Sequence, residues 1–192
     1  MNFKRIILGT LGLIFWTLAL TKSSAQSPEY LPARDYSKIS YELGPYYKDP
    51  INKFAIRYPK GWLIDNTDPV FNVKFIDPYY EVFIFIRVIP ISEPMPISYS
   101  FKDRIESLIK ELLKQFPGAG LRYCNFEKFQ NDTALRTQIL FNAGENRVLV
   151  HSLFIYDIER IIALSWVSEE RLFHTFRPWT ESAIGSLILN PQ

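Results

Sequence analysis

The chain has 192 residues, and its 22 basic and 20 acidic residues include no basic block that would follow nucleic-acid phosphates. Cys124 is the only cysteine, which excludes an intramolecular disulfide, and its place deep in the chain excludes a lipid-bearing N-terminal cysteine. We therefore expect Cys124 to behave as a small buried hydrophobic residue, and we expect no nucleic-acid partner.

The first 25 residues have the pattern of a secretory signal peptide. Lys4 and Arg5 precede an apolar run from Ile6 to Leu20, and the small residues at 23–25 suit a signal peptidase. The run is too short to span a bilayer comfortably, so we expect cleavage after residue 25 and no transmembrane span afterwards. An uncleaved N-terminal anchor is the alternative, because Lys22 lies close to the cleavage point. Cleavage would leave 19 basic and 20 acidic residues, a net charge of −1.

Residues 26–51 are predicted to form an extended leader, and the folded domain to span residues 52–192. The leader is rich in Pro, Tyr and Ser and shows neither helical nor strand periodicity. Its tyrosines are a candidate arm for docking onto a partner protein, because Tyr combines contact area with a polar tip. Packing on the chain's own domain is the alternative. The arm consists of Tyr36, Tyr41, Tyr46 and Tyr47.

Three strands are predicted at the start of the domain. The first, 54–58, is ended by a proline and a glycine. The third, 81–89, is apolar with little alternation, which is typical of a strand covered on both faces. The second, 70–76, is expected to place three apolar residues on one face: Phe71, Val73 and Phe75.

An amphipathic helix is predicted over residues 100–116. Ser100 and Asp103 form a variant of the capping box, and Pro117 and Gly118 end the helix. Charged residues fill one face. The other face consists of apolar residues at helical spacing: Phe101, Ile105, Leu108, Ile109, Leu112, Leu113 and Phe116.

Four strands and a second helix complete the predicted domain. Short turn-like joins make the strands antiparallel neighbours, at 122–129, 134–142, 147–156 and 161–167. The helix is predicted over 178–189, with Pro178 in its first turn, after a helical turn at 169–176. This order predicts an α+β protein built as an α/β/α sandwich. A central antiparallel sheet of about seven strands would carry helices on both faces and leave no cavity for chemistry.

Several motifs in the chain resemble the PsbP family. The run Tyr58-Pro59-Lys60-Gly61-Trp62 is similar to the YPxGW corner near the start of that family's domain. Asp68-Pro69-Val70 followed by Val73-Lys74-Phe75 is similar to a run of its cyanobacterial members, and 81–88 to its next core strand. Ser168-Glu169-Glu170-Arg171, with Phe176 and the run 184–187, resembles its C-terminal ending. The resemblance to the PsbP family, within the PsbP/Mog-like superfamily, extends from about Phe54 to Leu189.

The resemblance implies a PsbP/Mog-like fold and a non-catalytic accessory protein in the thylakoid lumen or periplasm. Such a protein would bind photosystem II subunits at the lumenal membrane face, and would stabilise the oxygen-evolving complex or assist its assembly. The resemblance also implies an association with calcium, without ligand residues to carry over. In the corner motif, Trp62 is expected to close one end of the core and Gly61 to supply a turn.

Two other functions remain open from the sequence. One is an exported envelope protein, unrelated to photosynthesis, that binds a small ligand or a stress-related partner. The other is an enzyme such as a hydrolase, for which no base is placed beside a nucleophile. His151 and His174 have no further ligand at metal spacing. We therefore predict that the chain is not an enzyme and has no catalytic or metal-binding residues, and the sequence leaves cofactor-binding residues open.

Four carboxylates near predicted turns lack the spacing of a calcium-binding loop and are expected to be solvated. They are Asp77, Glu81, Glu169 and Glu170.

Overall fold

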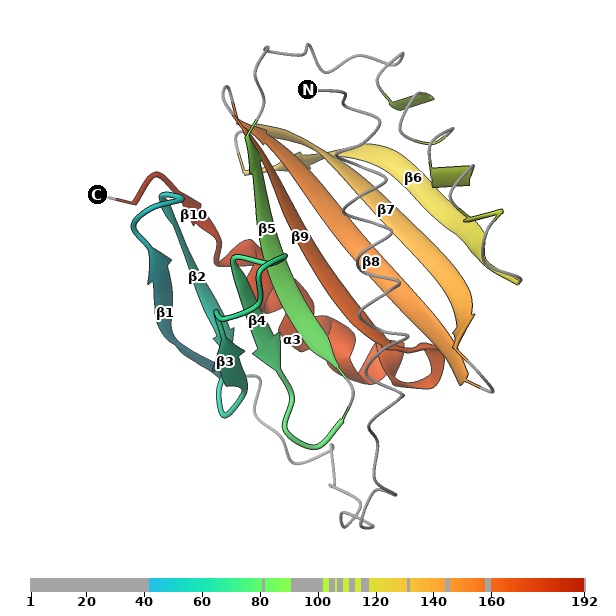
Figure 1. Ribbon diagram of the computed structural model, residues 1–192, viewed down its shortest axis with the longest axis horizontal. Coiled ribbons are helices and arrows are strands. Elements are labelled where there is room, and N and C mark those ends of the chain that lie inside the picture. The colour runs from blue at the N-terminus through green and yellow to red at the C-terminus, as the bar shows by residue number, and fades with distance from the viewer. Residues whose placement is uncertain are drawn as a thin grey trace.

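The computed structural model describes residues 42–80, 82–90, 102–103, 106, 109–110, 113–114, 118–130, 132–143, 146–157 and 160–191. The strands in these residues form two antiparallel sheets (Figure 1). The smaller sheet has the order β1 (Leu43–Asp49), β2 (Phe54–Pro59), β10 (Ile188–Leu189). The larger sheet has the order β3 (Leu63–Asp65), β4 (Val73–Ile76), β5 (Phe83–Pro90), β9 (Arg160–Glu169), β8 (Asn146–Asp157), β7 (Asp132–Ala143), β6 (Gly120–Phe129).

The seven-stranded antiparallel sheet was predicted, but the strand at 54–58 does not belong to it. That strand is β2, which pairs with β1 on one side and β10 on the other. Asp49 stabilises the tight β1–β2 connection, because its carboxylate accepts the backbone N–H of Asn52 at 2.8 Å. A local hairpin therefore takes up β2, and the short strand β3 occupies the edge of the larger sheet instead. Residues 43–49, placed in the leader by the sequence, are extended and paired in this hairpin.

The second predicted strand is shorter than expected and begins at Val73. Val73 and Phe75 share one core cluster, whereas Phe71 belongs to the cluster on the other face, so the expectation of one shared face is wrong. The reason is a turn just before β4, in which the Asp68 carboxylate accepts the N–H groups of Val70 and Phe71.

The four later strands confirm the predicted antiparallel run, each a few residues longer than expected. The prediction that the strand near 81–89 is covered on both faces is also confirmed. Ile84 and Ile86 of β5 are buried in one cluster, and Phe85 and Ile89 are buried in the other.

The C-terminal helix α3 (Phe173–Gly185) follows a short 3-10 helix, η3 (Glu170–Leu172). Pro178 therefore lies inside α3 rather than in its first turn, which corrects the predicted start. The apolar stripe of the helix begins earlier, at Phe173 and Phe176, and this burial outweighs the hydrogen bond that a proline cannot make. The predicted end is also wrong, because Ile188 and Leu189 pair with β2 as β10.

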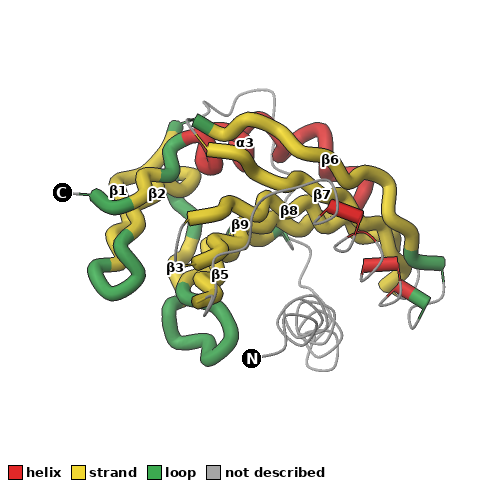
Figure 2. The backbone as a smooth tube through the Cα atoms, turned by 90° about the horizontal axis from the view of Figure 1, so that it is seen from above, coloured by secondary structure: helices red, strands yellow, loops and turns green. Residues whose placement is uncertain are grey.

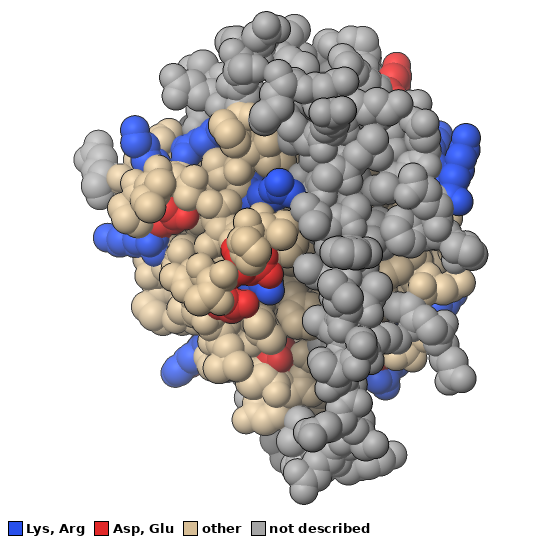
Figure 3. Space-filling view, in the orientation of Figure 1, with Lys and Arg blue, Asp and Glu red and all other residues tan. Residues whose placement is uncertain are grey.

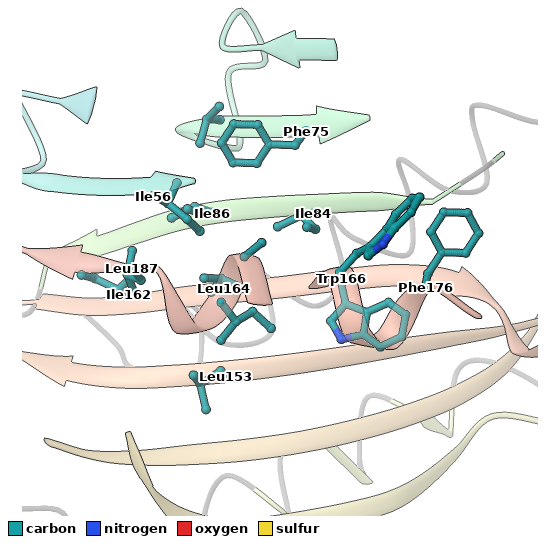
Figure 4. Packing of buried hydrophobic residues seen from close by; sticks show 14 of the residues in the cluster. Ile56, Phe75, Ile84, Ile86, Leu153, Ile162, Leu164, Trp166, Phe176 and Leu187 are labelled. Carbon is teal, nitrogen blue, oxygen red and sulfur yellow. The ribbon is translucent and has the colours of Figure 1, made fainter. Parts of the chain in front are cut away.

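The helix α3 and the smaller sheet both pack against one face of the larger sheet (Figures 1 and 2). Figure 4 shows Phe176 of α3 and Ile56 of β2 in the same cluster as Ile84 and Trp166.

The opposite face has its own apolar cluster. Of the predicted helix at 100–116, the residues described are 102–103, 106, 109–110 and 113–114; the first six of these are helical and 114 is in a turn. Ile109 and Leu113 are buried in this second cluster, whereas Ile184 of α3 belongs to the first. The remainder of 100–116 lies outside the described residues, so helices on both faces stay a prediction. No helix in the described part of the chain combines the length and apolarity needed to cross a membrane.

Candidate ligand-binding cleft

One row of paired residues crosses the larger sheet from β5 to β6. The register pairs Ile84 with Trp166, Trp166 with His151, His151 with Gln138, and Gln138 with Tyr123. Directly paired residues of antiparallel strands point to the same face, so all five lie on the side that carries α3. Ile84 and Trp166 are fully buried, whereas Tyr123 is 40% exposed. The row thus changes from apolar core to polar surface as it passes His151.

A cleft of about 620 Å³ lies over the polar end of this row. Its floor is formed by β6, β7 and β8, and one wall is formed by α3. The helix contributes Phe173, Arg177 and Glu181, which recur every fourth residue and therefore lie on one stripe. We call this feature the α3 cleft; it contradicts the expectation that the covered sheet would leave no cavity.

Arg136 of β7 is the centre of the hydrogen bonds in the α3 cleft. Its Nε donates to Glu127 at 2.5 Å, and its Nη1 donates to Glu181 at 2.9 Å and to Nε2 of His151 at 2.8 Å. Burial lowers the pKa of Arg136, but the bond to Glu127 and the charges of both glutamates outweigh burial and raise this pKa. One guanidinium thus ties together β6, β7, β8 and α3.

His151 is held in a single neutral form. Arginine only donates, so Nε2 of His151 accepts from Arg136 and the ring proton must lie on Nδ1. Burial, followed by the charges of Arg136 and Arg177, lowers the pKa of His151 to about 3. The ring is nearly parallel to those of Trp166 and Phe173, with centroids 5.8 and 6.1 Å away. At neutral pH, His151 is therefore a rigid uncharged wall residue and a poor general base.

The other two arginines of the α3 cleft differ from Arg136 and from each other. Arg122 forms an ion pair with Glu170 at 2.6 Å. Arg177 has no carboxylate partner among the described residues, and its guanidinium lies 6.0 Å from the centre of the Phe173 ring. Glu181, one helical turn after Arg177, bonds to Arg136 instead. The cleft therefore presents one cation without a counter-ion.

The corner motif belongs to the covered core. Gly61 has a φ of +87°, which favours glycine, and the N–H of Trp62 donates to the carbonyl of Pro59 at 3.2 Å. Trp62 is 5% exposed and packs near Phe176 of α3. Tyr58 stacks on a core phenylalanine, Phe75, with the ring centres 4.9 Å apart.

The tyrosines of the candidate arm have different surroundings. Tyr36 and Tyr41 lie outside the described residues. Tyr47 packs on the chain's own core, with its ring centre 5.8 Å from that of Phe75. Tyr46 is 45% exposed on the opposite side of β1.

The carboxylates considered for calcium are mostly engaged elsewhere. Asp77 is 3% exposed and accepts the N–H groups of Tyr79 and Tyr80, so the expectation that it is solvated is wrong. Glu169 bonds to Arg171 and Asn146. Glu170 pairs with Arg122 and, at 3.1 Å, with Arg147. Glu81 lies outside the described residues.

The remaining metal and thiol candidates do not converge. In the part of the chain that the structure describes, no three His, Cys, Asp or Glu side chains gather as a metal-binding group. His174 is exposed on α3, and its ring meets that of Phe173 edge-on. Cys124 is half-buried, and burial is the main cause that raises the pKa of its thiol to about 11. Cys124 therefore remains protonated at neutral pH.

Sequence reasoning missed the α3 cleft although part of its signal is present. Arg136 and Gln138 alternate with the apolar residues Leu135 and Ile139, which marks a polar face of β7. What brings this face to α3 is the register across β6, β7 and β8, and no local pattern encodes that register.

Solved structures with a similar fold include three well-covered proteins. Cyanobacterial PsbP (CyanoP) from Synechocystis matches with a TM-score of 0.55 and 14% identity, over 82% of this chain and 98% of that chain. LpqN of Mycobacterium tuberculosis, involved in cell envelope biogenesis, matches with a TM-score of 0.57 and 9% identity, over 86% of this chain and 100% of that chain. The Ran-binding protein Mog1p of Saccharomyces cerevisiae matches with a TM-score of 0.55 and 8% identity, over 79% of this chain and 97% of that chain.

These similarities define the fold and leave the biochemical role open. No protein-family model and no curated protein matches the sequence. The chain has the PsbP/Mog1 fold, as the motifs predicted. The three proteins are a cyanobacterial PsbP, a protein involved in cell envelope biogenesis and a Ran-binding protein, so a shared fold does not determine a shared partner.

Proposed function

We propose that this chain is an exported, non-catalytic binding protein that holds a small ligand in the α3 cleft. The observation that carries the proposal is the convergence of polar side chains from four elements around one hollow of about 620 Å³. That volume is within the range of about 300–1,000 Å³ for small-molecule sites. Export is supported by the signal-like first 25 residues.

The absence of catalysis is supported by the chemistry of the described lining residues. They include no serine, threonine or cysteine to act as a nucleophile. His151 already accepts a hydrogen bond on Nε2, and its pKa of about 3 leaves it a weak base. The arrangement is suited to hold a molecule in place rather than to move its protons.

The test is retention of a small molecule by the full chain, produced with its N-terminal segment so that export takes place. The purified protein is incubated with a small-molecule extract, and retained compounds are identified by mass spectrometry. Gln138→Trp fills the middle of the cleft and should abolish retention. Lys128→Trp adds the same ring at an exposed position of β6 outside the cleft and should retain the compound. Equal retention by both variants would contradict the proposal.

A second candidate is a lumenal accessory protein of photosystem II. It is supported by the CyanoP similarity, which covers 98% of that chain, and by the resemblance of the 168–171 ending. In this role the chain would exclude water and shield ions such as calcium at a protein interface. The test is affinity capture by the tagged chain from native thylakoid membranes. Photosystem II subunits should be recovered, and recovery of none would reject this candidate.

A further inference from the structure

The α3 cleft has one positive charge more than its neighbours balance. Its lining contains three arginines and two glutamates, and His151 is neutral. The adjacent pair of Arg147 with Glu170 does not change the excess, because Glu170 serves both Arg147 and Arg122. Arg136 with Glu127 and Glu181 has a net charge of −1, and Glu170 with Arg122 and Arg147 has a net charge of +1, so these two groups cancel. The remaining charge is that of Arg177, which has no carboxylate partner among the described residues. An incoming anion would therefore supply the missing counter-charge.

The geometry favours a carboxylate with a single charge. The planar guanidinium of arginine matches a carboxylate in two parallel hydrogen bonds. A dianion would place its second charge near Glu127 and Glu181, whose only described partner in the cleft is Arg136. Like charges brought together in a partly desolvated site oppose binding. A cationic ligand would likewise be opposed, because the positive charges of Arg177 and Arg136 would repel it.

Aromatic surface flanks the free cation. The Phe173 ring lies beneath the guanidinium of Arg177, and it stacks on the ring of Trp166 at 4.7 Å and on that of His151 at 6.1 Å. Tyr123 is 40% exposed and lies at the open end of the same row. A flat ring bound here would extend this set of rings.

Building on the proposed function, we infer that the α3 cleft binds a small aromatic monocarboxylate. Its carboxylate pairs with Arg177, and its ring lies against Tyr123 and the edge of Phe173. Arg136 acts as a positioning residue that fixes Glu181 away from Arg177 and so keeps that guanidinium available.

The test uses three probes built on the same naphthalene ring, titrated into the ¹⁵N-labelled full chain and followed by NMR. 2-Naphthoate is the monoanion, 2-naphthamide is its neutral analogue, and 2-naphthyl phosphate is the dianion. 2-Naphthoate should shift the Arg177 side-chain resonance and bind at least tenfold more tightly than either other probe. Arg177→Gln should weaken 2-naphthoate at least tenfold and leave 2-naphthamide unchanged. Arg171→Gln, an exposed arginine of η3 outside the cleft, should leave every affinity unchanged.

Equal affinities for the three probes, an unaltered affinity in Arg177→Gln, or no shift with any probe would overturn the inference. These outcomes do not decide the proposed function. The retention experiment with Gln138→Trp and Lys128→Trp tests cleft binding without assuming an anion, so the two ideas can fail separately.

Discussion

The two ends of one row across the larger sheet show how the same sheet face becomes core at one end and binding wall at the other. At the β5 end, Ile84 and Trp166 are fully buried beneath α3 and the smaller sheet. At the β6 end, Gln138 and Tyr123 lie on the floor of the α3 cleft. The strands are continuous, and the pairing is regular from β5 to β7, with an irregularity only beside Tyr123 of β6. The difference therefore lies mainly in what covers them.

The covering elements are too narrow to reach the whole face. Seven strands spaced by about 4.8 Å are roughly 29 Å across. A helix with its side chains is about 10–12 Å wide, which covers roughly two strands. The smaller sheet covers the β4–β5 side, where Phe54 and Ile56 pack against Phe75 and Ile84. The middle of β6 and β7 is left without an apolar cover on this face, and Glu127, Arg136 and Gln138 occupy it. Toward the strand ends, the face joins the covered cluster through Phe129, Ala134 and Leu140.

The face seen in Figure 3 has basic and acidic side chains of the described residues interspersed, without a large basic patch. The charge that matters for the α3 cleft is the local one at Arg177.

Substitutions at the covered end and at the open end of the row should differ most in their effect on the free energy of unfolding. Trp166→Ala should lower the free energy of unfolding by about 3–5 kcal/mol, because it leaves a cavity in the covered core. Tyr123→Ala, in the same row, should change it by less than about 1 kcal/mol, because the residue is 40% exposed and its loss leaves no enclosed cavity. Urea unfolding followed by circular dichroism measures both. Similar losses at the two positions would contradict the division of the face.

His151, between the two ends, should make stability depend on pH. The pKa of His151 in the folded protein, about 3, lies below the ordinary value of 6.5. Between these two pH values the unfolded chain therefore binds a proton at His151 that the folded chain does not bind. The stability that neutral His151 contributes is fully present above pH 6.5 and is lost as the pH falls toward 3. Between pH 6.5 and 4 the wild type should lose about 3 kcal/mol more than His151→Gln.

The measurement is urea unfolding of both proteins from pH 7 to pH 4. The charged groups that face His151 and its partner Arg136 are Arg177, Glu127 and Glu181, and they are present in both proteins. Their own titration therefore largely cancels in the difference. A difference that does not change with pH would show that His151 takes up a proton as readily in the folded protein as in the unfolded chain, which contradicts the lowered pKa.

Removal of the central guanidinium should have a smaller effect. Arg136→Gln leaves Glu127 and Glu181 without their partner, and we expect a loss of about 1–2 kcal/mol because both carboxylates are partly solvated. Thermal unfolding at pH 7 measures the loss. Lys60→Gln breaks a fully exposed pair with Glu42 and should leave the midpoint unchanged. A midpoint for Arg136→Gln equal to that of Lys60→Gln would contradict the central role of Arg136.

The smallest predicted change concerns the turn that delivers Trp62 to the covered end. Gly61→Ala should cost about 1 kcal/mol, because φ is +87° and an L-residue is strained there although space is open. Gly185→Ala, at the end of α3 with open space and an ordinary φ, should instead stabilise by up to about 1 kcal/mol. Chemical unfolding should therefore show opposite signs, and equal signs would contradict this reading of the turn.

The parts of the fold that short stretches of sequence define were predicted correctly. The four later strands were found because alternation and short turns suffice to define them. The place of β2 was not predicted, because β2 pairs with residues 43–49 in a hairpin instead of joining the larger sheet. Residues 43–49 show no alternation that would have indicated this strand. The start of α3 was misplaced because Pro178 suits a first turn, yet the burial of Phe173 and Phe176 extends the helix before it.

The candidate site depended on contacts between distant residues. His151 was recognised as a chemical candidate, but its partner Arg136 is fifteen residues away and Glu181 is forty-five residues from Arg136. Their meeting is fixed by strand register and by the docking of α3, and both are properties of the folded chain.

The most direct test of the divided sheet face is a map of backbone amide shifts when the full chain takes up the compound that it retains from a small-molecule extract. We expect shifts in β6, β7, β8 and the Phe173–Glu181 stripe of α3, with β3, β4 and β5 unchanged. Shifts confined to β3–β5 or to the smaller sheet, with the α3 cleft unchanged, would contradict this expectation.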